Sequence, residues 1–121
     1  MEMYQIVAFL KQNNIHAEYI PKTGVYRLTA HQGDWKPIII LRKINDDLFE
    51  LWDAGGLEAA HFYVGQNPDT AVTIAAAKAA AAGFNYYYGV RAMARSLEEV
   101  LTVYQQMIQM IEEAAKPPHT P

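Results

Sequence analysis

The sequence predicts an α+β protein in which helices flank an antiparallel sheet of about four to six strands. Three observations lead to this fold class. First, apolar residues repeat with a helical period near both ends of the chain. Second, an alanine-rich run lies in the second half. Third, the segments between these helical regions are short, rich in aromatic and β-branched residues, and bounded by turns. With 121 residues and 51% hydrophobic side chains, the chain can bury one core. We expect a single domain over residues 1–115 and a disordered tail, "KPPHTP", over 116–121.

The first predicted element is an amphipathic helix. Its apolar residues repeat at i, i+3, i+4 and i+7, at Met3, Ile6, Val7 and Leu10. Asn13 and Asn14 suit its end, because asparagine tolerates the left-handed conformation.

Extended segments follow, separated by the turns "PKTG", "QGDW" and "NDD". They are "IHAEYI", "VYRLTAH", "KPIIILRK" and "LFELWD", with "AHFYVG" as a further candidate. The continuous apolar run in "KPIIILRK" is typical of a strand that is buried on both faces.

Two more helices are predicted in the second half. Asn67 is a suitable N-cap, Pro68 suits the first helical position, and the alanine-rich run that follows ends at Gly83. Alanine here reflects either helix propensity or close packing against a neighbour, and we favour close packing. Ser96 and Glu99 form a capping box before a last helix with one apolar stripe, made of Leu97, Val100, Leu101, Tyr104, Met107, Ile108 and Ile111. This stripe and the flat alanine helix predict a symmetric homo-oligomer, because they offer more apolar area than one small sheet needs.

The segment "FNYYYGVRAMA", residues 84–94, is predicted to be one strand with two different faces. One face carries the core side chains Phe84, Tyr86, Tyr88, Val90 and Ala92. The other face carries Asn85, Tyr87, Gly89, Arg91 and Met93. An aromatic ring stacks on a base or peptide group, and arginine holds a phosphate or carboxylate with two hydrogen bonds. The candidate residues for binding a ligand or partner are therefore Asn85, Tyr87, Arg91 and Arg95, while a plain solvent-facing strand surface is the alternative.

Residue types that carry common chemistry are scarce or scattered. There is no cysteine, the only serine is the predicted cap Ser96, and no two of the four histidines have metal-site spacing. Four carboxylates, Asp46, Asp47, Glu50 and Asp53, are interpreted as a solvated acidic edge. We therefore expect a protein that is not an enzyme and holds no metal or cofactor. The net charge of -3 argues against nucleic acid as a partner, and the absence of a signal peptide or membrane-length apolar run predicts a cytoplasmic protein.

The order helix, strands, helix, strand, helix, with "IVAFLKQNNI" leading into hairpins, resembles class I type III secretion chaperones and the related YbjN-type bacterial domains. In that resemblance "NPDTAVTIAAA" corresponds to the second helix and "SLEEVLTVYQQMI" to the last. The resemblance implies a homodimer that binds a partner polypeptide, as a chaperone-like or inhibitor-like module without chemistry of its own. The alternative is a sponge or sensor that sequesters a nucleotide-like anion on the aromatic and arginine surface.

Overall fold

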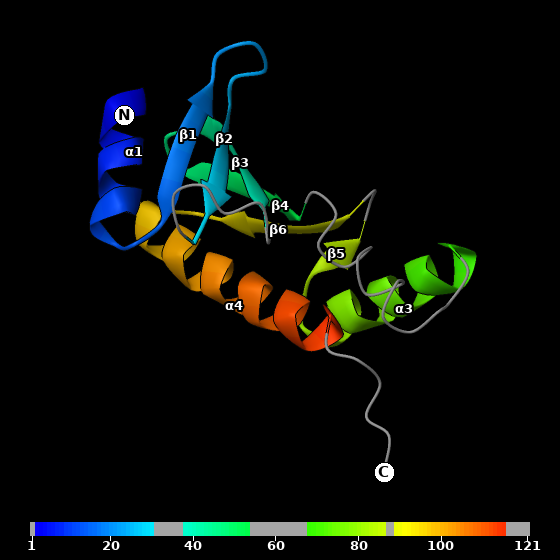
Figure 1. Ribbon diagram of the computed structural model, residues 1–121. Helices are drawn as coiled ribbons and strands as arrows, with labels where there is room; N and C mark the ends of the chain where they lie inside the picture. The colour runs from blue at the N-terminus through cyan, green and yellow to red at the C-terminus, as the bar shows by residue number, and fades with distance from the viewer. Residues whose placement is uncertain (1, 31–37, 54–67, 87–88, 116–121) are drawn as a thin grey trace.

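The computed structural model describes residues 2–30, 38–53, 68–86 and 89–115 and confirms the α+β fold class (Figure 1). In chain order, its elements are α1 (Met3–Gln12), β1 (His16–Ile20), β2 (Val25–Thr29), β3 (Ile39–Asn45), β4 (Leu48–Asp53), α3 (Pro68–Ala81), β5 (Asn85–Tyr86), β6 (Val90–Ala94) and α4 (Leu97–Ala115). Among these described helices, none is long and apolar enough to span a bilayer.

The six strands form one antiparallel sheet with the order β1-β2-β3-β4-β6-β5. The first four strands follow one another as a meander. The strand β6 then joins β4 after α3, and the two-residue β5 lies at the edge, where it pairs with β6. The sheet therefore brings together segments that lie about forty residues apart in the sequence, such as Glu50 and Met93.

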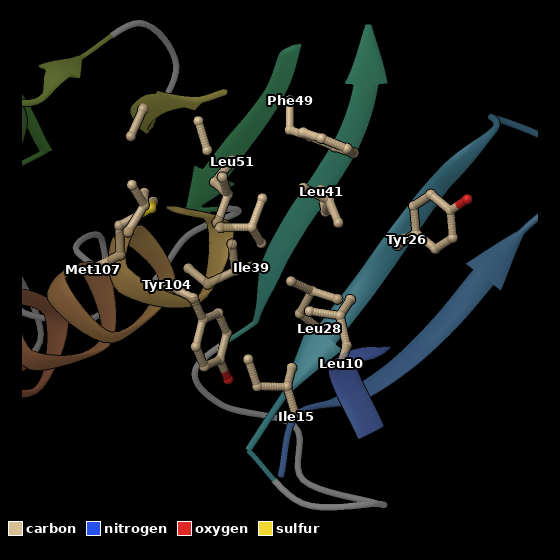
Figure 2. Packing of buried hydrophobic residues seen from close by; sticks show 14 of the residues in the cluster. Leu10, Ile15, Tyr26, Leu28, Ile39, Leu41, Phe49, Leu51, Tyr104 and Met107 are labelled. Carbon is tan, nitrogen blue, oxygen red and sulfur yellow. The ribbon is translucent and has the colours of Figure 1, made fainter. Parts of the chain in front are cut away.

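Helices α1 and α4 cover one face of this sheet, and the core lies between them and the strands (Figure 1). On the sheet side, Leu28, Ile39, Leu41, Phe49 and Leu51 are fully buried. Side chains of α4 and of the central strands meet in this cluster, where Figure 2 labels Tyr104 and Met107 of the helix. We call this covered side the core face and the opposite side the outer face.

The apolar stripe of α4 is used within the chain itself. Its stripe residues Leu97, Val100, Tyr104, Met107 and Ile111 are buried, and Leu101 and Ile108 pack half-buried against the same core. This stripe was one of the two reasons for predicting self-association. Since it covers the chain's own sheet, the homo-oligomer stays a prediction without that support.

Strand β3 differs from its prediction. Ile39 and Leu41 have no exposed surface, but Ile40 is half-buried and Arg42 is exposed. Burial on both faces was therefore wrong for this strand. The physical reason is the antiparallel arrangement, in which α1 and α4 pack on one face only.

Helices α1 and α3 both end as the sequence predicts, with a residue in the left-handed conformation. At the end of α1, Asn14 has φ 64°, and the N–H of Ile15 donates to the carbonyl of Leu10 at 2.9 Å. At the end of α3, Gly83 has φ 82°, and the N–H of Phe84 donates to the carbonyl of Ala79 at 2.8 Å. This pattern is a Schellman motif, which satisfies carbonyls at a helix end.

Helix α3 begins at Pro68, as predicted. It packs against β5, β6 and α4, and Ala79 is fully buried there. Ala77, Ala80 and Ala81 are exposed instead, so close packing explains Ala79 and helix propensity explains the others.

Residues 84–94 do not form one strand. They form β5 and β6, which pair antiparallel with Asn85 opposite Arg91 and Tyr86 opposite Val90. The chain reverses before Val90, and Gly89 has φ 127°, a conformation that side chains rarely adopt. The prediction of a single strand was wrong because it treated Gly89 as a gap in a strand surface.

The predicted division into two faces survives this reversal. Directly opposed residues of an antiparallel pair share a face, so Tyr86 and Val90 lie together, and Asn85 and Arg91 lie together. Val90 is fully buried, whereas Phe84 and Tyr86 are only half-buried, which corrects the full burial predicted for them.

Several predicted features lie outside the described residues. They are the turn "QGDW", the strand "AHFYVG", the cap Asn67, the side chains Tyr87 and Tyr88, and the tail 116–121.

Ser96 caps α4, because the N–H of Glu99 donates to Ser96 Oγ at 3.1 Å. We expect Ser96→Ala to lower the free energy of unfolding by about 1 kcal/mol, as loss of a cap usually does. Ser96→Asp keeps an acceptor at this position and should retain most of that stability. Urea denaturation of the two variants measures the difference. A variant that loses binding but not stability would show that the hydroxyl is functional rather than structural.

Tyr26 gives the fold a dependence on alkaline pH. Its ring is buried on the core face, 5.1 Å from the ring of Tyr19. Burial raises the pKa of Tyr26 above its usual 10.0, and the neighbouring Tyr19 raises it further. The folded state thus holds this proton more strongly than the unfolded state does. The stability from this difference is complete below pH 10 and is lost as pH rises through the folded pKa.

We therefore expect the melting temperature to fall more steeply above pH 10 in the wild type than in Tyr26→Phe. Thermal melts of both proteins at several pH values between 8 and 11 make the comparison. Parallel melting curves over this range would contradict it.

Candidate functional site: the outer face of the sheet

One row of directly opposed residues crosses all six strands on the outer face. From β1 to β5 the row consists of Glu18, Arg27, Ile40, Trp52, Arg91 and Asn85. Opposed side chains on one face lie about 4.5–5.5 Å apart at Cβ, so neighbours in this row are in reach of each other. The row therefore brings charged, aromatic and amide side chains from the whole sheet into one line.

Arg91 is held in place by two neighbours in this region. Its Cζ lies 4.7 Å from the ring centroid of Trp52, which is a cation–π geometry. Its Nη1 donates to Glu50 Oε1 at 3.3 Å, and only 16% of the Glu50 side chain is exposed. The guanidinium is thus stacked on an aromatic ring and neutralised by a carboxylate.

Arg42 shares the same carboxylate. Its Nη2 lies 3.3 Å from Glu50 Oε1, and its side chain is 56% exposed. Arg42, Glu50 and Met93 form a second row beside Ile40, Trp52 and Arg91, since Arg42 opposes Glu50 and Glu50 opposes Met93. We name these residues the outer patch: Ile40, Arg42, Glu50, Trp52, Arg91 and Met93.

Gly89 lets the backbone before β6 lie against Trp52. A Cβ built at Gly89 would fall inside contact distance of the Trp52 indole and of the Asp53 carbonyl oxygen. Gly89 itself is buried and has positive φ, so two independent constraints favour glycine here. This close approach restricts the position of the Trp52 ring, on which Arg91 stacks.

Only part of the predicted site is brought together. Asn85 is exposed and stands opposite Arg91, as the division into faces requires. Arg95 is exposed but follows the end of β6, about 13 Å along the chain from Arg91 at the usual rise of a strand. Tyr87 lies outside the described residues.

The interpretation of four carboxylates as a solvated acidic edge needs correction. Asp46 and Asp47 are indeed exposed, and Asp46 pairs with Lys43 at 2.8 Å. Asp53, however, is only 1% exposed, and Glu50 lies in the outer patch with both arginines. The physical reason is strand alternation: Asp53 stands opposite Ile39 on the core face, and Glu50 faces the other way.

Trp52 and Glu50 are the residues that sequence reasoning missed. The alternation in "LFELWD" was the available signal, because it places Phe49 and Leu51 on one face and Glu50 and Trp52 on the other. Their meeting with Arg91 was not predictable from that pattern, since it depends on β6 pairing with β4 across 41 residues.

A hollow with a volume of about 420 Å³ lies between α3 and α4, away from the outer patch. Its walls combine one charged group and two amides with apolar surface: Lys78, Gln106, Gln109, Ala81, Ala82, Phe84 and Met110. Of the predicted site residues that the structure describes, Asn85, Arg91 and Arg95, none lines it. Within the described part of the chain, no three histidine, aspartate or glutamate side chains are grouped so that they could hold a metal ion.

We compared the chain with protein families, curated proteins and solved structures. The resemblance to secretion chaperones and YbjN-type domains stays a prediction from the order of elements. No protein-family model, no curated protein and no solved structure matches the chain.

Proposed function

We propose that this protein is a non-enzymatic module that binds a partner polypeptide on the outer face of its sheet. The observation that carries the proposal is the arrangement of the outer patch, where Trp52, Arg91 and Glu50 hold one another in place. Such a preorganised group loses little conformational entropy when a partner binds. Among the described helices, α1, which packs on β1, and α4, which packs on β4 and β6, lie on the core face.

The side-chain types of the outer patch suit a protein interface. Tryptophan, arginine and methionine are enriched at such interfaces, and tryptophan and arginine dominate their binding energy. Met93 is 42% exposed, and Ile40 and Trp52 are half-buried, so they offer apolar contact around the charged group. A partner that packs on these three side chains would remove apolar surface from water.

The geometry supports a nucleotide-like anion less well. That alternative needs Arg91 to grip a phosphate, yet Glu50 already accepts a hydrogen bond from this guanidinium. A phosphate would have to displace Glu50, whose half-buried carboxylate would then repel it. We therefore prefer the polypeptide, and binding of a nucleotide is an outcome that the experiments below can detect.

Self-association is the remaining part of the proposed function, as the resemblance to dimeric chaperones implies. Light scattering during size-exclusion chromatography tests it directly. A dimer or higher symmetric oligomer at micromolar concentration would support it, and a monomer at high micromolar concentration would end it.

The binding proposal is tested with a random dodecapeptide display library panned against the immobilised wild-type protein. Affinities of the enriched peptides are then measured by fluorescence polarisation. We expect Met93→Ser to weaken these peptides about tenfold, because a central apolar contact is worth about 1–2 kcal/mol. The matched control is Met3→Ser, since Met3 is 44% exposed and lies on α1, away from the outer face.

Both substitutions are at exposed positions and should leave stability nearly unchanged, which circular dichroism melts would check. Two results would overturn the proposal. Either no peptide is enriched, or the enriched peptides bind Met93→Ser and wild type equally well.

A further inference from the structure

The hollow between the helices lies where α3 passes the second half of α4 (Figure 1). Its volume of about 420 Å³ falls in the range of small-molecule sites, which is about 300–1,000 Å³. The residues of the outer patch are all described by the structure, and none of them lines the hollow. The hollow is therefore separate from the surface proposed to bind a polypeptide.

Small side chains at the end of α3 leave this space open. Lys78, Ala81 and Ala82 are spaced i, i+3 and i+4, so they lie on one side of the helix end, and all three line the hollow. The two alanines have only a methyl group each, which leaves room beside α4. Phe84 also lines the hollow with a half-buried ring, and its N–H donates to the carbonyl of Ala79 at 2.8 Å. The end of α3 thus holds an aromatic wall in a fixed position.

Three polar side chains converge on the same space. Gln106 and Gln109 are one turn apart on α4 and face Lys78 of α3 across the hollow. All three are exposed, and within the described part of the chain no hydrogen bond or ion pair holds their side chains. Their donors and acceptors are therefore available to a ligand. Met110, 9% exposed, adds apolar surface between the helices.

The charge of the hollow suits a single negative group. Among the described residues that line it, Lys78 is the charged one. Glu112 lies one turn beyond Gln109 and is not among those lining residues. Lys78 also lies in the last turn of α3, where the helix dipole places partial negative charge. One lysine at this place can hold a carboxylate, whereas the several charges of a nucleotide phosphate would be poorly neutralised.

We propose that this hollow is a second binding site, which takes a small apolar molecule with one carboxylate. The carboxylate accepts hydrogen bonds from the Lys78 ammonium group and from a glutamine amide, and bonds of this charge-assisted kind are the stronger ones. The apolar part of the ligand packs on Phe84 and Met110 and removes their surface from water. This site goes beyond the proposed function, because it does not depend on a polypeptide at the outer patch.

Two such acids, 1-naphthoate and octanoate, test the proposal by NMR of the labelled methionine methyl groups. The signal of Met110 is assigned from Met110→Leu. We expect at least one acid to shift this signal and to leave that of Met93 in place. Lys78→Gln should weaken binding of that acid about tenfold, the usual effect of losing a hydrogen bond to a charged group.

Two controls isolate the carboxylate. The neutral amide of the same acid should bind the wild type more weakly than the acid does, and Lys78→Gln should not weaken it further. Lys11→Gln removes the same charge from an exposed position on α1 and should leave binding of the acid unchanged. Lys78 is exposed as well, so both variants should melt like the wild type.

Three results would overturn this proposal. One is a Met110 signal that neither acid shifts at millimolar concentration, as expected if the hollow holds only water. Another is equal affinity of the acid for wild type and Lys78→Gln. The third comes from ATP, which should not shift Met110; a shift that Lys78→Gln removes would make the hollow a phosphate site. A shift of Met93 by ATP would instead place a nucleotide on the outer patch and count against the proposed function, while the two acids still decide the role of the hollow.

Discussion

Phe49→Ala is expected to lower the free energy of unfolding by about 3–5 kcal/mol, the range for loss of a large core aromatic. Phe49 has no exposed surface and lies in the core cluster (Figure 2). In the sheet, it stands opposite Lys43 of β3 and Ala94 of β6. Alanine at this place would leave a cavity in a well-packed layer. Since domains of this size have total stabilities of about 5–15 kcal/mol, much of the fold's stability depends on this ring.

Urea denaturation measures this loss, with Phe49→Leu as the matched control. Leucine keeps most of the apolar volume, so it should cost clearly less than alanine. Leu48→Ala is a second control, because Leu48 directly precedes Phe49 on the strand and is half-buried. A cost below about 1 kcal/mol for Phe49→Ala would contradict the arrangement of the core, given the cavity term expected there.

Gly89→Ala is expected to have the second large effect. Its φ of 127° would strain any side chain, at about 1–3 kcal/mol. The added methyl group would also meet the Trp52 indole and the Asp53 carbonyl, and such overpacking costs about 1–3 kcal/mol more. Together these terms predict a loss of several kcal/mol and a displaced Trp52 ring.

Gly83→Ala separates these two terms. Gly83 has φ 82°, and a Cβ built there meets nothing within 4 Å, so the variant carries backbone strain without a clash. Gly89→Ala should therefore be clearly the less stable of the two in urea denaturation. Equal losses would mean that the backbone at Gly89 does not press against Trp52.

The helices were predictable because local signals define them. These signals are the 3.6-residue period of α1, the proline that begins α3 and the hydrogen bond from the N–H of Glu99 to Ser96. Each of them involves residues that are only a few positions apart in the sequence. The left-handed ends at Asn14 and Gly83 are local as well, since they depend on the residue type at one position.

The errors concerned features that depend on tertiary structure. The run "KPIIILRK" is apolar at successive positions, which alternate between the two faces of the strand. Among the described helices, α1 and α4 pack on the core face, and Ile40 lies on the outer face. Gly89 could serve in a strand or in a reversal, and the sequence around it favours strand residues in both cases. The choice between them depends on the approach of Trp52, which lies 37 positions earlier in the chain.

The candidate site was half predictable for the same reason. The face that Asn85 and Arg91 share follows from alternation, and this holds whether the chain continues or reverses. The partners of Arg91 do not follow from alternation. Glu50 and Trp52 reach it only because β6 pairs with β4, which no local pattern indicates.

The most direct test of the outer face as a binding surface is an NMR spectrum of the protein with its methionine and isoleucine methyl groups labelled. The chain has five methionines, and Met93 and Met3 are assigned from the spectra of Met93→Ser and Met3→Ser. On addition of an enriched peptide, we expect the methyl signals of Met93 and Ile40 to shift and those of Met3 and Ile6 to stay in place. Shifts at Met3 or Ile6 with an unchanged Met93 signal would place the binding surface elsewhere and contradict the proposed function.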